Sequence, residues 1–118
     1  MLDATFSKLE VWQKSHKFVL QIYRVTSKFP PHEKYRLVSQ LCRSASSVPT
    51  NIVEGNSRIS KKEYLRFLIT SKGSLEETKY HLLLARDLGY LKPAEFEDLS
   101  EQANEVGRML SGLIKSLK

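Results

Sequence analysis

The sequence is poor in the features that cross-link a chain or hold it in a membrane. Its single cysteine, Cys42, cannot form an intrachain disulfide, which favours a reducing compartment. The longest strictly apolar run covers only residues 82–85, whereas a membrane span needs about 20 apolar residues. No basic segment followed by an apolar one marks a secretory signal near Met1. We therefore expect a cytoplasmic protein that does not cross a membrane.

The composition is that of one folded domain. The chain has 118 residues, of which 41% are hydrophobic and 27% charged, so we expect a single domain over residues 1–118 and exclude disorder. The net charge is +6, yet residues 93–118 contain three basic and five acidic residues. A basic body with a mildly acidic tail suits a polyanionic partner, although such a charge also serves solubility.

Clusters of helix-breaking residues divide the chain into four segments. They lie at residues 27–32, 55–60 and 89–93, and the segments between them have helical rather than alternating apolar spacing. No Asn-Gly or Asp-Gly hairpin turn is present. The pattern predicts an all-α fold. Because short loops join helices of similar length, it also predicts an up-down-up-down antiparallel four-helix bundle.

Local signals place several helix boundaries. Ser60 and Glu63 have the spacing of a capping box at the start of the third helix. Pro93 suits the first turn of the fourth helix. In the second segment the apolar period stays in phase across Pro49, which predicts one helix that bends at the proline and ends near Gly55. The fourth helix has a narrow apolar seam at Phe96, Leu99, Ala103, Val106, Leu110, Leu113 and Leu117.

The first and third helices have more apolar residues than one buried face requires. Residues 80–85 include apolar side chains in nearly every direction around the third helix. The first helix has a broad face of Val11, Trp12, Phe18, Val19, Ile22, Tyr23, Val25 and Phe29. This excess predicts self-association. The alternative is a thick monomer core with some exposed leucines.

The search for catalytic chemistry finds no motif. The sequence has no glycine-rich phosphate loop, no paired cysteines and no H-E-x-x-H segment. Glu77 and His81 are four residues apart, whereas di-iron bundles need two Glu-x-x-His pairs. Cys42 lies on the apolar arc of the second helix, which favours a buried, inert thiol. We expect no enzymatic activity, no cofactor and no metal. A hydrolase or nuclease is disfavoured because Glu54 is the one carboxylate among the basic groups of that helix.

Two polar stripes are candidate binding surfaces. Their side chains can hold phosphates with fixed geometry, which predicts contact with an RNA or DNA backbone but no reading of bases. The alternative is a solvated face with local pairs such as Glu54 with Arg58. We expect the first helix to make more of the phosphate contacts than the second, because Glu54 or a neighbouring subunit can occupy Arg43 and Arg58. The stripes are Lys14, Lys17, Gln21, Arg24 and Lys28 on the first helix, and Arg36, Gln40, Arg43, Ser47, Thr50, Asn51, Glu54 and Arg58 on the second.

Four short segments resemble a known family. They are L-E-V-W-Q-K at residues 9–14, S-Q-L-C-R-S-A at 39–45, N-I-V-E-G at 51–55 and G-S-L-E-E at 73–77. They resemble the four-helix-bundle proteins encoded in 23S rRNA intervening sequences, over about residues 6–117. The resemblance marks Gln40, Asn51 and Glu54 as a family-motif polar face. The same block also fits a packing role, because Gly55, Ser71, Gly73 and Ser74 permit helices to approach closely.

The resemblance also implies an assembly and partners. The same family includes the accessory variability determinants of diversity-generating retroelements, ring-shaped homopentamers that bind nucleic acid and a reverse transcriptase. We therefore expect a cytoplasmic, homopentameric, non-enzymatic nucleic-acid-binding protein, with a reverse transcriptase as a candidate partner. The alternative is a protein-interaction adaptor that does not bind nucleic acid.

Overall fold

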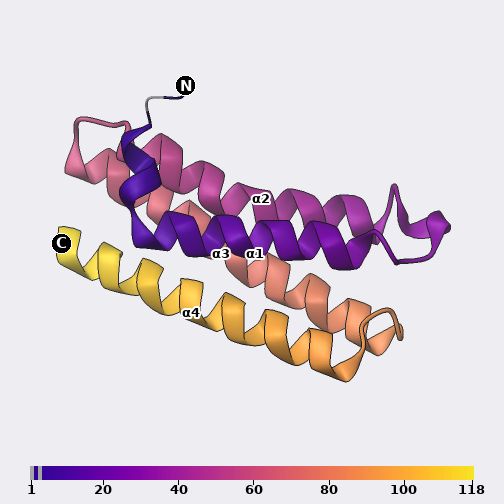
Figure 1. The fold of residues 1–118 in the computed structure, drawn as a ribbon. Coiled ribbons are helices and arrows are strands. Elements are labelled where there is room, and N and C mark those ends of the chain that lie inside the picture. The colour runs from indigo at the N-terminus through magenta and orange to yellow at the C-terminus, as the bar shows by residue number, and fades with distance from the viewer. Residues whose placement is uncertain (1, 3) are drawn as a thin grey trace.

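The chain forms four long helices. The computed structural model describes residue 2 and residues 4–118, and no strand occurs among them. The long helices are α1 (Glu10–Thr26), α2 (Leu37–Asn56), α3 (Lys61–Asp87) and α4 (Pro93–Leu117), and the short 3-10 helices are η1 (Thr5–Lys8) and η2 (Pro31–Glu33). Successive long helices run in opposite directions, and both termini lie at the same end of the molecule (Figure 1). The predicted all-α four-helix bundle is confirmed.

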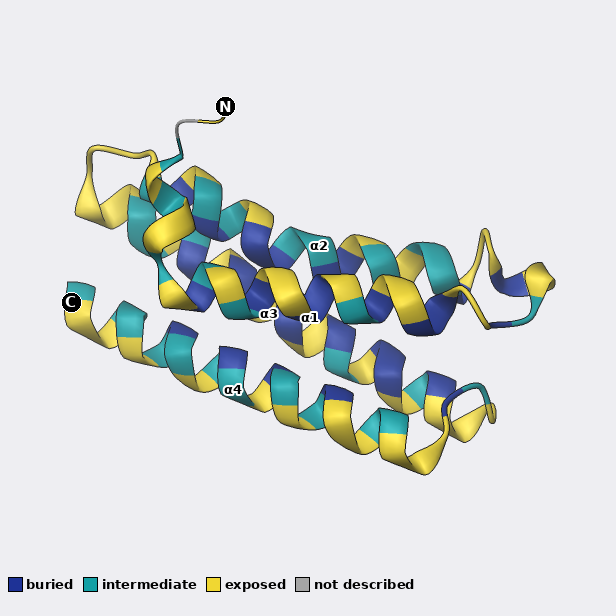
Figure 2. Ribbon diagram, viewed as in Figure 1, coloured by how far each residue is buried: buried dark blue, intermediate teal, exposed yellow. Residues whose placement is uncertain are grey.

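The helices surround one apolar core. Both α1 and α3 contact α2 and α4, and the pairing of α2 with α3 is the most extensive. The buried faces turn toward the middle of the bundle (Figure 2). No helix in the described part of the chain is long and apolar enough to cross a membrane. The largest fully buried apolar side chains are Phe18, Ile22, Leu41, Ile52, Leu68, Leu75, Leu82, Leu99 and Leu110.

The predicted helix boundaries agree with the structure. The Ser60 hydroxyl accepts a hydrogen bond of 3.3 Å from the Glu63 backbone N–H, so Ser60 caps α3. Beside Pro93, the Glu95 carboxylate accepts 2.9 Å from the Lys92 backbone N–H. The predicted seam of α4 is buried or half-buried along its whole length.

The second helix continues as one element through Pro49, which is buried, and ends at Asn56. The predictions of one helix and of its end near Gly55 are confirmed, and the bend at Pro49 stays a prediction.

A glycine allows α2 and α3 to approach closely at one end. A Cβ atom on Gly55 would lie 2.8 Å from the Phe67 Cβ and 2.9 Å from the Tyr64 Cδ1. Gly73 has no such role, because it is exposed and a Cβ there would meet nothing within 4 Å. The expectation that Gly73 permits close approach is wrong.

A buried carboxylate joins two loops at the opposite end. Glu33 accepts a 2.7 Å hydrogen bond from the Tyr90 hydroxyl and one of 3.4 Å from the Leu37 backbone N–H. The Tyr90 hydrogen bond is the largest cause of a lowered Glu33 pKa. The α1–α2 loop is thereby tied to the α3–α4 loop.

The apolar excess proves to be smaller on α1 than on α3. The broad face of α1 is mostly inside the bundle, and of its eight residues only Tyr23 is exposed, at 53%. On α3, Leu82 and Ala85 are buried, whereas Tyr80 and Leu83 are exposed. Leu20, also on α1, is exposed as well, so exposed apolar residues lie on both helices and self-association stays a prediction.

Candidate nucleic-acid interface

The basic stripe of α1 faces carboxylates of α4. The Lys14 ammonium lies 3.2 Å from Glu105, and the Lys28 ammonium lies 3.0 Å from Glu95. The pKa of Glu95 is lowered first by its hydrogen bond from the Lys92 backbone and then by the one from Lys28. These pairs neutralise part of the stripe.

The other two cations of the α1 stripe form no ion pair with the residues that the structure describes. Lys17 and Gln21 line a groove with Asp98, Gln102 and Glu105 of α4. Arg24 donates a 3.1 Å hydrogen bond to Gln21, and within residues 4–118 neither Lys17 nor Arg24 forms an ion pair. Two of the four cations of the α1 stripe are thus paired with carboxylates. The structure therefore gives no support for the expectation that α1 makes more phosphate contacts than α2.

Of the three arginines predicted on the second helix, only Arg43 lies within α2, because Arg36 is its N-cap and Arg58 follows its end at Asn56. All three are exposed, and none forms an ion pair in the described part of the chain. The local pair of Glu54 with Arg58, the alternative weighed from the sequence, does not form, because Arg58 lies beyond the end of the helix. The Arg58 guanidinium instead lies over the Phe67 ring, 4.7 Å from its centroid. Of the motif face, Gln40 and Glu54 are exposed to solvent.

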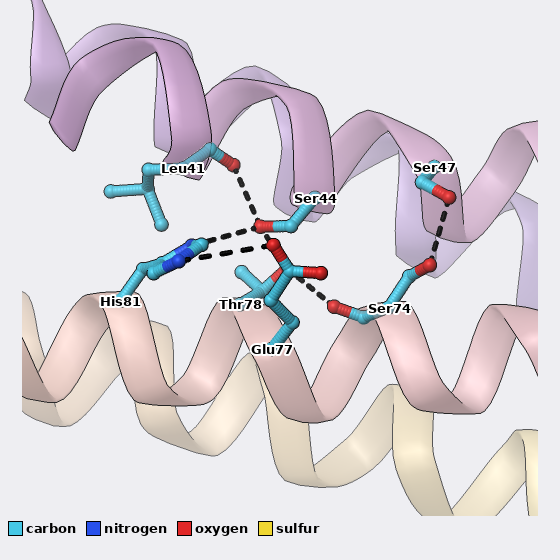
Figure 3. Close-up of polar contacts among 7 residues, drawn as sticks. All are labelled: Leu41, Ser44, Ser47, Ser74, Glu77, Thr78 and His81. Carbon is cyan, nitrogen blue, oxygen red and sulfur yellow. Dashed lines mark hydrogen bonds and ion pairs between the residues drawn. The ribbon is translucent and has the colours of Figure 1, made fainter. Parts of the chain in front are cut away.

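Part of the predicted polar face of α2 is internal. The Ser47 hydroxyl lies 2.8 Å from the Ser74 hydroxyl of α3 (Figure 3). Asn51 donates to the Ser47 carbonyl at 2.8 Å and to the Ser47 hydroxyl at 3.0 Å. The Ser71 hydroxyl donates 2.8 Å to the Val48 carbonyl. Ser47 and Ser71 therefore join α2 to α3, whereas Asn51 holds Ser47 within α2, which supports the packing role foreseen for this block.

The same seam contains a serine beside a histidine. The Ser44 hydroxyl lies 3.3 Å from His81 Nδ1, and the Thr78 hydroxyl donates 2.9 Å to Ser44 (Figure 3). Glu77 lies 3.8 Å from His81 Nε2. Although these residue types also occur in hydrolases, Ser44 is 4% and His81 5% exposed, so a substrate has no access to the hydroxyl. His81 is a core residue, as expected for a lone histidine on a helix.

The remaining candidate groups for chemistry are also structural. Cys42 is half-buried, 3.6 Å from the Thr26 hydroxyl, and burial raises the pKa of its thiol. The thiol is therefore protonated at neutral pH, which favours the inert role predicted for it. Among residues 2 and 4–118, no three His, Cys, Asp or Glu residues are placed to hold a metal ion.

An open groove of about 570 Å³ lies between the end of α2 and the start of α3. Sequence reasoning placed Arg58 on a polar face but missed what α3 adds. The sequence did indicate that these residues lie on the surface of α3, because the helical repeat places Arg66 and Thr70 on the face opposite Leu68 and Leu75. The groove is lined by Asn51, Arg58, Glu63, Arg66, Phe67, Ile69 and Thr70.

The protein is thus a small antiparallel four-helix bundle whose surface has exposed arginines. The family described as 23S rRNA-intervening sequence protein matches residues 7–112, so the chain belongs to this family. The resemblance seen in the sequence is thereby confirmed. The further relation to accessory variability determinants stays a prediction.

A solved structure has the same fold. It is a protein of unknown function from the S23 ribosomal protein family of Bacteroides thetaiotaomicron VPI-5482, with a TM-score of 0.83. The two sequences are 24% identical over 89% of this chain and 95% of the other. No curated protein matches the sequence.

Proposed function

We propose that the protein is a non-enzymatic, oligomeric nucleic-acid-binding protein of the cytoplasm that contacts the backbone of RNA or DNA. The observation that carries this proposal is that Arg36, Arg43 and Arg58, at the start, within and just beyond the end of α2, are exposed and form no ion pair with the residues that the structure describes. Guanidinium groups without carboxylate partners bind phosphates well, since their donors form planar pairs of hydrogen bonds. The family description, which refers to 23S rRNA, favours RNA.

Several exposed basic residues gather beside α2 and the start of α3. The carboxylates of α4 take up Lys14 and Lys28 of α1, whereas the start of α3 adds exposed Lys61, Lys62 and Arg66 beside α2. This surface, together with Lys17 and Arg24, is where we expect phosphates to bind.

Oligomerisation would multiply weak contacts. We infer that copies associate through the exposed apolar residues of α3, Tyr80 and Leu83, and the family resemblance makes a homopentamer the expected assembly. Each subunit then repeats the basic surface around one axis, so the contacts add. A reverse transcriptase stays a candidate partner on the strength of the same resemblance.

Salt titration tests the proposal. Fluorescence anisotropy with mixed-sequence RNA and DNA should show a linear fall of log affinity with log salt between about 50 and about 200 mM. Changing Arg36, Arg43 and Arg58 to glutamine should reduce the single-strand slope by about 2, because each lost phosphate contact removes about 0.7.

A second triple variant removes the same charge from α1. Changing Lys14, Lys17 and Arg24 to glutamine should reduce the slope by only about 1.4, because Lys17 and Arg24 belong to the expected phosphate surface whereas Lys14 is already paired with Glu105. Sedimentation should give both variants the wild-type mass. If no nucleic acid binds at about 50 mM salt, nucleic-acid binding is excluded.

The second candidate function is a protein-interaction adaptor. Tyr80, Leu83 and Leu88 on or beside the end of α3 are exposed, and an apolar patch of this kind suits a protein partner. An adaptor would bind its partner with little dependence on salt and would not bind RNA.

A further inference from the structure

The groove between α2 and α3 combines positive charge with exposed apolar surface. Arg58 and Arg66 line it together with Phe67 and Ile69. Ile69 is 56% exposed, although it belongs to a residue type that is usually buried. The stacking of Arg58 on Phe67, at 4.7 Å, orients its planar guanidinium within the groove. A ligand that matches this lining needs both an anionic group and a flat apolar group.

The polar side chains of the groove further limit which ligands it can bind. Asn51 already donates its amide hydrogens to Ser47, so it can offer a ligand only its amide oxygen, which accepts hydrogen bonds from a base or a ribose. The carboxylate of Glu63 repels phosphate, which leaves the Arg58 and Arg66 side for the anion. The groove volume of about 570 Å³ lies within the range of small-ligand sites.

We propose that this groove holds an unstacked nucleotide of single-stranded RNA, with its phosphate on Arg58 and Arg66 and its base against Ile69. The inference rests on the proposed function and names the place where the nucleic acid is held. A duplex keeps its bases stacked inside and can offer this groove only phosphates, whereas a single strand can present a base face. The groove should therefore bind single strands in preference to duplexes.

Two groove variants separate the base contact from the phosphate contacts. Fluorescence anisotropy would use a labelled RNA of about 12 nucleotides, single-stranded or paired with its complement. Ile69→Ser should weaken single-strand binding about fivefold, because it removes the apolar contact with a base, and leave duplex binding unchanged. The double variant R58Q/R66Q should lower the single-strand salt slope by about 1.4, equivalent to two phosphates.

Matched controls lie elsewhere on the bundle. Leu20→Ser changes an exposed apolar residue of α1, and R108Q/K115Q removes the same charge from α4. Both should leave single-strand affinity within about twofold of wild type. Circular dichroism and sedimentation would check that every variant keeps its fold and mass.

The outcomes distinguish the groove from the wider surface. The nucleotide site in the groove is excluded if Ile69→Ser weakens binding of both RNA forms equally or not at all. It is also excluded if R108Q/K115Q lowers affinity as much as R58Q/R66Q does, because nucleic acid would then bind a diffuse basic surface. If the wild-type protein binds neither RNA form at about 50 mM salt, the proposed function fails and the groove fails with it.

Discussion

At the residue scale, His81 is a buried ionisable side chain whose protonation affects folding. It lies between α2 and α3, where Ser44 is 3.3 Å from Nδ1 and Glu77 is 3.8 Å from Nε2. Burial lowers its pKa from the ordinary value of 6.5, and the Glu77 charge opposes this effect only in part. The folded protein therefore holds the imidazole in its neutral form more firmly than the unfolded chain does.

This depressed pKa predicts a loss of stability in mild acid. Below about pH 6.5 the unfolded chain binds a proton that the folded chain resists, so the free energy of unfolding should fall as pH decreases. Urea denaturation at about pH 7.5, 6.5 and 5.5 would measure it, in a range where carboxylates stay ionised. His81→Gln should flatten the dependence, and His16→Gln, at an exposed position, should not. Equal stability at pH 7.5 and 5.5 would contradict the prediction.

Single residues also show where sequence reasoning succeeds and where it stops. The helical period placed Leu99, Val106 and Leu110 on the buried face of α4 because burial follows the 3.6-residue repeat within one helix. The ion-pair partners of Lys14 and Lys28 could not be predicted from the sequence, because they depend on which helix lies beside α1 and in which register. For the same reason Ser47 was placed on a solvent face, although it contacts Ser74.

At the scale of elements, α2 and α3 are joined by small polar side chains and a glycine in addition to the large apolar residues of the core. Hydroxyl groups of Ser71 and Ser74 reach the facing helix at 2.8 Å, and Gly55 lies directly against Tyr64 and Phe67. Ser71, Ser74, Thr78 and His81 recur at spacings of three and four along α3. That spacing is a recognisable sign of a polar helix contact, whereas the atoms that meet Gly55 depend on helix register.

The glycine contact gives a prediction about stability. Gly55→Ala should destabilise the fold by about 1–3 kcal/mol, because the new methyl group overlaps packed atoms. Its Cβ would lie 2.8 Å from the Phe67 Cβ and 3.3 Å from the Tyr64 carbonyl oxygen, which cannot move without shifting α3. Urea denaturation of the variant against wild type measures the change.

Gly73 supplies the matched control. It is a helical glycine with nothing within 4 Å of an added Cβ, so Gly73→Ala should stabilise the fold by about 0.5–1 kcal/mol. If Gly55→Ala also proved stabilising, α2 and α3 would not be in close contact at that end.

At the scale of the whole molecule, the ion pairs and the exposed apolar residues lie on different helices. Acidic side chains of α4 face the lysines of α1, whereas exposed Tyr80 and Leu83 lie on α3. The sequence predicted an excess of apolar surface on α1 and α3, but only three-dimensional packing shows that α1 buries most of its share. Under the proposed function, we expect Tyr80 and Leu83 to contact further copies and the arginines beside α2 to contact nucleic acid.

The last prediction concerns that assembly. Sedimentation at micromolar concentration should give a mass several times 13.6 kDa, with five subunits expected.

Leu83 is 38% exposed and Phe18 is fully buried, so the same charge introduced at each position should have different effects. Leu83→Glu should yield a folded monomer, because it charges only the contact between copies. Phe18→Glu should unfold the subunit, because a carboxylate would enter the apolar core. Leu20→Glu, at an exposed position of α1, should leave the assembly intact. A wild-type protein that sediments as a monomer would exclude self-association through α3, and the apolar surface of that helix would then be assigned to a different protein partner.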